Sequence, residues 1–138
     1  MSGGLLRVVL LAVGAVMIAL GLNVGFGGIK TLGWQTAGEF VQATDIVAFS
    51  NQDNHVRFLG GFWLGAGLLM AAGSVFLTQL RSVLVAITAM VFVAGLARLS
   101  APDPQVVFGA GVLPSLAVEL VLYPLLGVWL WRAGRGVA

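Results

Sequence analysis

Cysteine is absent from this sequence, and histidine occurs once, as His55. Without cysteine the chain forms no disulfide, no thiolate metal site and no cysteine nucleophile. A single histidine excludes a metal site with several histidine ligands. The sequence also lacks a phosphate-binding loop, a nucleophile elbow and any cofactor motif. We therefore expect no metal centre and no cofactor.

Charged residues are scarce as well. They make up 9% of the 138 residues, whereas hydrophobic residues make up 59%. A soluble domain carries about 25% charged residues, so this chain cannot cover its own surface in water. The net charge is only +2, and no basic patch interleaves with aromatic residues, which argues against nucleic-acid binding. The composition predicts a single integral membrane domain over residues 1–138, with membrane lipids as its surroundings.

The sequence contains four long apolar runs. They cover about residues 5–22, 56–77, 82–99 and 111–131. Each is close to the roughly 20 residues that cross a hydrocarbon core as a helix. None shows the alternation of a membrane β-strand. The prediction is an all-α membrane protein, a bundle of four transmembrane helices.

The first run has a second interpretation. Arg7, the apolar run and Ala19-Leu20-Gly21 resemble a secretory signal with its cleavage site. The run is long for such a signal, and its basic region is one residue. We interpret it as a membrane helix.

The distribution of basic residues predicts the orientation. The N-terminus, the turn expected at Thr78–Arg81 and the C-terminus share one side of the membrane and carry no acid. Their arginines are Arg7, Arg81, Arg132 and Arg135. On the other side Lys30 stands alone, apart from Arg57 and Arg98 at helix ends. The positive-inside rule predicts that both termini are cytoplasmic, with Trp129 and Trp131 as an aromatic anchor at the inner face.

The connection between the first two helices, residues 23–55, is long and extracytoplasmic in this topology. It begins with Gly25–Gly28, which we expect to be irregular. One interpretation of its second half is a short amphipathic helix on the outer interface, and an ordinary loop is the alternative. The apolar residues of that helix are Phe40, Val41, Val47 and Ala48. Ser50–Asn54 supplies residues that favour the N-cap of the second helix, and Asp53 is interpreted as a cap.

The second helix is rich in glycine. Gly61 and Gly65 form a Gly-x-x-x-Gly pair, which lets helix backbones approach closely in lipid. We predict that this pair packs against another helix of the bundle, and a homodimer face is the alternative.

Ionisable residues inside the apolar segments are the candidates for function. Glu119 is predicted near mid-membrane, where a carboxylate requires a partner. Ser115, Glu119 and Tyr123 follow at intervals of four and share a helix face. Arg98 is expected to reach Glu119, because a guanidinium binds a carboxylate with two hydrogen bonds.

These residues predict a polar ligand-binding site in the outer half of the bundle. Its candidate residues are Arg57, Arg98, Glu119, Asn54 and Ser115. Two structural alternatives stand beside it: the arginines snorkel to the head groups, or Arg98 and Glu119 only hold helix register. His55 is interpreted as an interfacial residue.

Three segments carry a resemblance to a known family. They are NHVRFLGGFWLGAGLLM (54–70), AGLARLSAPDP (94–104) and LPSLAVELVLYPLLGVWLW (113–131). They resemble an uncharacterised bacterial four-helix membrane family, domain of unknown function four-three-four-five. The residues that carry it are Arg57, Gly60, Gly61, Gly95, Arg98, Ser100, Pro114 and Glu119. The resemblance implies a bacterial inner-membrane protein and brings no activity with it.

Three functional hypotheses follow. The first is binding of an amphipathic or lipid-like small molecule at the polar site. The second is a structural or accessory subunit of a larger membrane complex, or of a homo-oligomer. The third is an isomerase or hydrolase in which Glu119 acts as acid or base and Tyr123 donates a proton. The third rests on a single carboxylate, so an enzyme is the weakest of the three.

Overall fold

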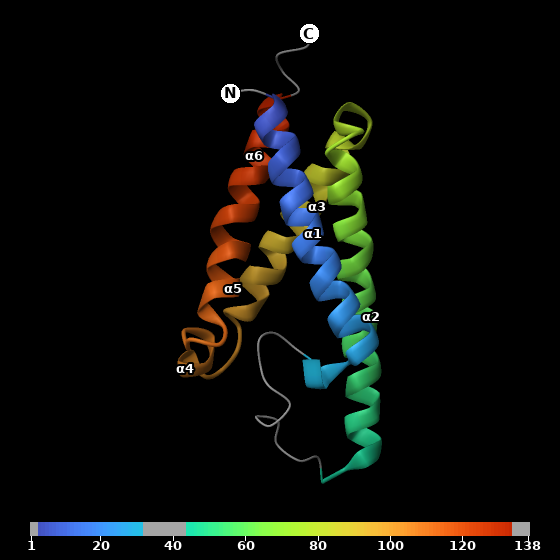
Figure 1. Ribbon diagram of the computed structural model, residues 1–138. Coiled ribbons are helices and arrows are strands. Elements are labelled where there is room, and N and C mark those ends of the chain that lie inside the picture. The colour runs from blue at the N-terminus through green and yellow to red at the C-terminus, as the bar shows by residue number, and fades with distance from the viewer. Residues whose placement is uncertain (1–2, 32–43, 134–138) are drawn as a thin grey trace. The chain divides into compact units, whose positions relative to one another are not determined.

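The structure is a computed structural model that describes residues 3–31 and 44–133. All its elements are helical (Figure 1). In chain order they are α1 (Gly3–Gly27), the 3₁₀ turn η1 (Ile29–Thr31), α2 (Ile46–Gly73), α3 (Leu77–Arg98), α4 (Pro104–Val107), α5 (Leu113–Ala117), the π-helix η3 (Val118–Leu122) and α6 (Tyr123–Ala133).

Four helical segments are long and apolar enough to cross a membrane. They are Gly3–Gly27, Ile46–Gly73, Leu77–Arg98 and Leu113–Ala133. The prediction of four membrane helices is confirmed at this level of length and composition. The chain divides into two compact units, Val8–Ala72 and Met1–Arg7 with Gly73–Ala138.

In the unit Val8–Ala72, α1 and α2 run side by side in opposite directions (Figure 1). Glycines permit the close approach. A Cβ at Gly14 would lie 2.6 Å from the Ala71 nitrogen, and a Cβ at Gly67 would lie 2.7 Å from the Ile18 nitrogen. Such distances are below van der Waals contact, so only glycine fits.

The predicted packing pair is a different set of glycines. Gly61 and Gly65 are exposed, and nothing among the described residues lies within 4 Å of a Cβ placed on either. The glycines of α2 that contact α1 are Gly60 and Gly67. The Gly61–Gly65 pair therefore does not face α1, and its packing against another helix stays a prediction. The Gly-x-x-x-Gly spacing identifies a helix face without side chains. It does not indicate whether that face contacts the neighbouring helix, because the helix is apolar on every side.

The second helix begins earlier than predicted, at Ile46 rather than near residue 56. Asp45 explains the start, because its Oδ1 accepts hydrogen bonds from the Val47 and Ala48 nitrogens, as an N-cap does. Ser50–Asn54 thus lies inside α2, and the prediction that it caps the helix is wrong. Of the predicted interfacial helix, Phe40 and Val41 lie outside the described residues, and Val47 and Ala48 belong to α2.

The first helix also runs past its predicted end, because α1 continues to Gly27. Gly28 then turns the chain with φ of +76°, a conformation that L side chains rarely adopt. The next residues form η1. Most of the stretch Gly25–Gly28 is therefore helical, and only Gly28 departs from the helix.

The turn between α2 and α3 lies at 74–76 rather than at the predicted Thr78–Arg81. Arg7 Nη1 donates to the Ser74 carbonyl oxygen at 2.6 Å and to that of Val75 at 2.9 Å. A guanidinium at these carbonyls complements the negative end of the α2 dipole.

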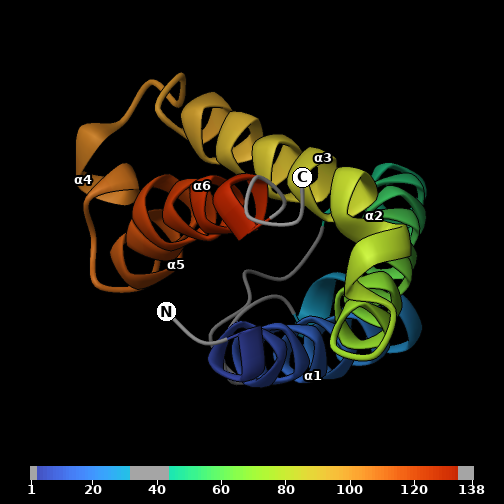
Figure 2. The ribbon, with the colours of Figure 1, turned by 90° about the horizontal axis from the view of Figure 1, so that it is seen from above.

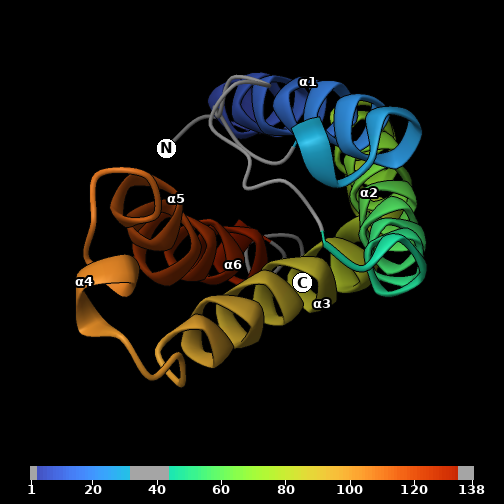
Figure 3. The same ribbon diagram turned by 90° about the horizontal axis from the view of Figure 1, so that it is seen from below.

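In the unit that contains Gly73–Ala138, α3 packs antiparallel to α6 (Figure 2). The buried residues of α3 recur every three or four positions: Leu84, Ile87, Thr88, Val91 and Gly95. Those of α6 are Tyr123, Leu126 and Leu130. The chain between the two helices contains the short α4 (Figure 3). Its N-cap is Asp103, whose side chain accepts a hydrogen bond from the Gln105 nitrogen.

Candidate functional site

An ion pair joins α3 to the following membrane segment. Arg98 Nε lies 2.9 Å from Glu119 Oε2, and the two side chains are 44% and 6% exposed. Arg98 is the last residue of α3. Glu119 lies about 9 Å from Leu113 along its segment, at 1.5 Å per residue, and so within the candidate span Leu113–Ala133. The pair therefore places a buried carboxylate against a cation that is still half open to its surroundings.

The contact is electrostatic, with poor hydrogen-bond geometry. Oε2 of Glu119 is buried and makes no hydrogen bond to the described residues, although Arg98 Nε is at ion-pair distance. A buried carboxylate oxygen without a hydrogen bond is costly, because the group loses hydration and gains no directed donor. The site thus leaves one strong acceptor unsatisfied.

Gly95 allows Glu119 to approach α3. A Cβ at Gly95 would lie 2.8 Å from Glu119 Cβ and 3.0 Å from Leu120 Cδ2. Gly95 and Arg98 are three positions apart and so share a helix face. One residue provides the space for the carboxylate and the other provides its counter-charge.

The backbone at Glu119 is a π-helix. The Tyr123 N–H donates to the Val118 carbonyl oxygen, five residues back, instead of to Glu119 as in an α-helix. Pro124, the next residue, has no N–H to offer the Glu119 carbonyl. A wide turn of this kind frequently marks a functional position.

The other candidates on this segment differ in their surroundings. Tyr123 is buried. Ser115 is half-buried, and its hydroxyl donates to the Val112 carbonyl oxygen at 2.8 Å. The Ser115 proton is therefore used within its own helix.

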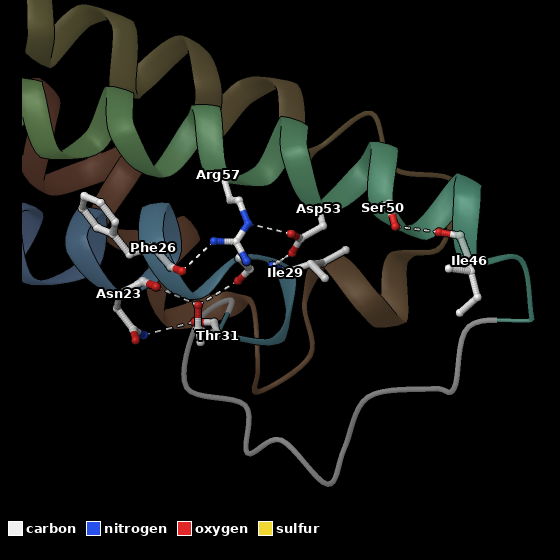
Figure 4. A network of polar contacts seen from close by, with 9 residues as sticks. Asn23, Phe26, Ile29, Thr31, Ile46, Ser50, Asp53 and Arg57 are labelled. Atoms are coloured by element: carbon white, nitrogen blue, oxygen red, sulfur yellow. Dashed lines mark hydrogen bonds and ion pairs between the residues drawn. The ribbon is translucent and has the colours of Figure 1, made fainter.

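Arg57 belongs to a separate polar network in the unit Val8–Ala72 (Figure 4). Its Nε contacts Asp53 Oδ2 at 2.6 Å, and its Nη1 donates to the Phe26 carbonyl oxygen at 2.5 Å. Asp53 Oδ1 accepts from the Ile29 nitrogen at 2.7 Å. This network fastens the end of α1 and the start of η1 to α2. Asp53 lies inside α2, so its interpretation as a helix cap is wrong.

A known family matches most of the chain. The family described as "Domain of unknown function (DUF4345)" matches residues 5–130. The chain belongs to this family. No curated protein and no solved structure matches it. The match includes both the Arg98–Glu119 pair and the Asp53–Arg57 network, and the family description assigns neither a role.

In this DUF4345 chain the predicted site residues belong to the two compact units: Arg98, Glu119 and Ser115 to one, Arg57 and Asn54 to the other. Arg98 and Glu119 are brought together as expected. Arg57 pairs with Asp53 instead, and Asn54 and His55 are exposed. Across residues 3–31 and 44–133, no group of three or more His, Asp or Glu side chains is arranged to hold a metal ion.

Sequence reasoning missed two residues of this DUF4345 chain. The partnership of Asp53 with Arg57 follows an i, i+4 spacing that is recognisable once α2 is known to include both residues. Gly95 was noted only as part of the family resemblance. Its three-residue spacing from Arg98 indicates a shared face, but not that the face meets Glu119.

Proposed function

We propose that this protein is a small polytopic membrane protein that binds an amphipathic or lipid-like molecule, with the polar head of the ligand at Arg98 and Glu119. The observation that supports the proposal is the unequal exposure of the pair. Glu119 is buried with an unsatisfied oxygen, whereas Arg98 is half-exposed and approaches that oxygen through Nε. A pair that served packing alone would favour full mutual hydrogen bonding.

The chemistry of the pair defines the ligand class. The Arg98 terminal nitrogens, Nη1 and Nη2, suit a carboxylate or phosphate oxygen, which a guanidinium binds with paired hydrogen bonds. Glu119 Oε2 suits a hydroxyl or N–H donor. An apolar tail on the same molecule would remain in the hydrocarbon layer, where its transfer from water is favourable. A lipid, an isoprenoid or a fatty-acid derivative has this combination.

The test is native mass spectrometry of the protein extracted gently from its own membrane. Wild type is compared with Arg98→Gln and with Lys30→Gln, which removes one positive charge at an exposed residue outside the site. We expect a bound small molecule in wild type and Lys30→Gln, and its loss in Arg98→Gln. Retention of the molecule in Arg98→Gln would refute this site.

Arg98→Gln leaves the Glu119 carboxylate without its cation, so misfolding must be separated from loss of ligand. The double variant Arg98→Gln/Glu119→Gln removes both charges and avoids an uncompensated buried ion. We expect the single variant to lose about 1–3 kcal/mol of stability and the double variant less. A folded double variant that still holds the molecule would also refute the site.

We also propose that the protein resides in the bacterial inner membrane with both termini cytoplasmic. Four spans support a shared side for the termini, and the excess of arginine on that side supports the direction. The Arg98–Glu119 pair then lies toward the extracytoplasmic face, where a ligand enters from the outer leaflet.

A role as an accessory subunit is the second candidate, and one observation favours it. Gly61 and Gly65 form an exposed smooth pair on α2 with nothing within 4 Å among the described residues. Such a pair suits a helix of another membrane protein or of a second copy. The same mass spectra test this role: fixed protein partners that are lost in Gly65→Leu, with no small molecule in any sample, would favour it over ligand binding.

A further inference from the structure

A second feature of the unit Gly73–Ala138 lies away from the ion pair. It is an open groove of about 300 Å³ between α3 and the segment that ends in α6. The lining residues are Val85, Thr88, Ala89, Phe92, Pro124, Gly127, Val128 and Trp131. The groove is apolar throughout, because the one hydroxyl, that of Thr88, donates to the Val85 carbonyl oxygen within its own helix.

Small and ring side chains produce the groove. The helices approach closely at Gly127, where a Cβ would lie 2.6 Å from Thr88 Oγ1. Pro124 and Ala89 present little side-chain volume beside this contact, while Phe92 and Trp131 form the walls. A membrane protein surface of this shape accommodates a hydrocarbon chain better than a flat helix face does, because more of the chain makes van der Waals contact.

The helix register places two arginines at one end of the groove. Thr88 lies against Gly127, and Gly95 lies against Glu119. Residue numbers therefore increase along α3 in the direction in which they decrease along the segment from η3 to α6. Arg81 is seven residues before Thr88, about 10 Å along α3. Arg132 is five residues after Gly127, about 7.5 Å along α6. Both arginines therefore lie beyond the same end of the groove, next to Trp131.

We propose that this groove binds one acyl chain of an anionic phospholipid, with the phosphate held by Arg81 and Arg132. The apolar lining matches the chain, and the two cations match the charge of the head group. Trp131, which is half-exposed, lies between the two as an aromatic residue does at head-group level.

This site is distinct from the one proposed at Arg98 and Glu119. Arg81 and Arg98 are 17 residues apart on α3, about 25 Å at 1.5 Å per residue. That length is close to the thickness of the hydrocarbon core, so the two sites face opposite leaflets. An experiment can therefore refute one of the two proposed binding sites and leave the other standing.

Trp131 provides the test. Trp34, Trp63 and Trp129 are replaced by phenylalanine, so that Trp131 is the only tryptophan. The protein is reconstituted in phosphatidylcholine vesicles that contain a rising fraction of phosphatidylglycerol brominated in its acyl chains, and quenching of Trp131 is recorded. Brominated phosphatidylcholine is the reference lipid.

We expect the relative association constant to favour the anionic lipid about tenfold, and Arg81→Gln or Arg132→Gln to lower that preference about fivefold each. Ala89→Phe fills the groove and should reduce quenching by both lipids. Lys30→Gln, which removes an exposed positive charge outside both sites, should leave the preference unchanged. Equal quenching by the two lipids in the parent protein would overturn the proposal. So would an absence of quenching, which would mean that a protein segment or a second copy covers the groove.

Discussion

Arg57 and Arg98 carry the same guanidinium, but the chain holds them in different ways. Arg57 is bound through two nitrogens, to Asp53 and to the Phe26 carbonyl. Arg98 approaches, through Nε, a carboxylate oxygen that makes no hydrogen bond to the described residues. The first arrangement fixes a helix end, and the second is the one that we propose for ligand binding. The number and direction of contacts, more than residue type, separates a structural arginine from a candidate binding residue.

The Asp53 network gives a prediction at this scale. In Asp53→Ala the Ile29 N–H loses its acceptor and Arg57 loses its counter-ion, so the chain after α1 should open more often. Hydrogen exchange of the segment around Ile29, followed by mass spectrometry in detergent, should become faster. Asn54→Ala is the matched control, because Asn54 is the exposed neighbour. Unchanged exchange in Asp53→Ala would show that the network does not hold this segment.

At the scale of elements, α1 and α2 pack closely at the positions where a glycine has no side chain to separate the two backbones. Gly14 and Gly67 face the partner helix, whereas Gly61 and Gly65 do not. All of these positions lie in helices of uniformly apolar character. In lipid, helices associate mainly through close van der Waals packing. The glycines that face the partner helix are therefore the ones that a larger residue cannot replace.

Two alanine substitutions in α2 should therefore have opposite effects. Gly67→Ala forces a methyl group against the Ile18 nitrogen and should cost about 1–3 kcal/mol. Gly65→Ala meets open space and should stabilise the helix by about 0.5–1 kcal/mol, since alanine has the higher helix propensity. Thermal unfolding in detergent, followed by circular dichroism, measures both. Equal destabilisation by the two would contradict the observed helix face.

For the whole molecule, length and apolar composition give four candidate spans, and an even number of crossings returns the chain to its starting side. Orientation then depends on the charges that remain outside the apolar layer. In the orientation that we propose from the positive-inside rule, Arg81 and Arg132 lie on the cytoplasmic side. This orientation determines which membrane leaflet each of the two proposed binding sites faces.

The orientation is testable because the chain contains no cysteine. An introduced cysteine is then the only thiol. Gln105→Cys should react with a membrane-impermeant maleimide in intact spheroplasts, whereas Gln79→Cys should react only after lysis. Both residues are exposed, which makes them a matched pair. The reverse pattern would invert the membrane orientation and with it the leaflet of each site.

Composition and residue spacing are enough to predict the class of protein and much of one site. A near absence of charge, four apolar runs and a lone intramembrane glutamate predicted four membrane helices and the pairing of Glu119 with Arg98. These follow from local physics: hydrocarbon excludes charge, so an ionisable group there needs a partner.

The folded structure was needed to show which glycines face another helix, that Asp53 pairs with Arg57, and that Gly95 admits Glu119. The glycine contacts join residues of different helices, whereas the Asp53–Arg57 pair lies within α2 and depends on where that helix begins. Helices that are apolar on every side carry little periodic signal about which face is buried. The start of α2 was also settled by structure, because Asp45 and the run Ser50–Asn54 both offer capping residues, and only the folded chain shows which of them is used.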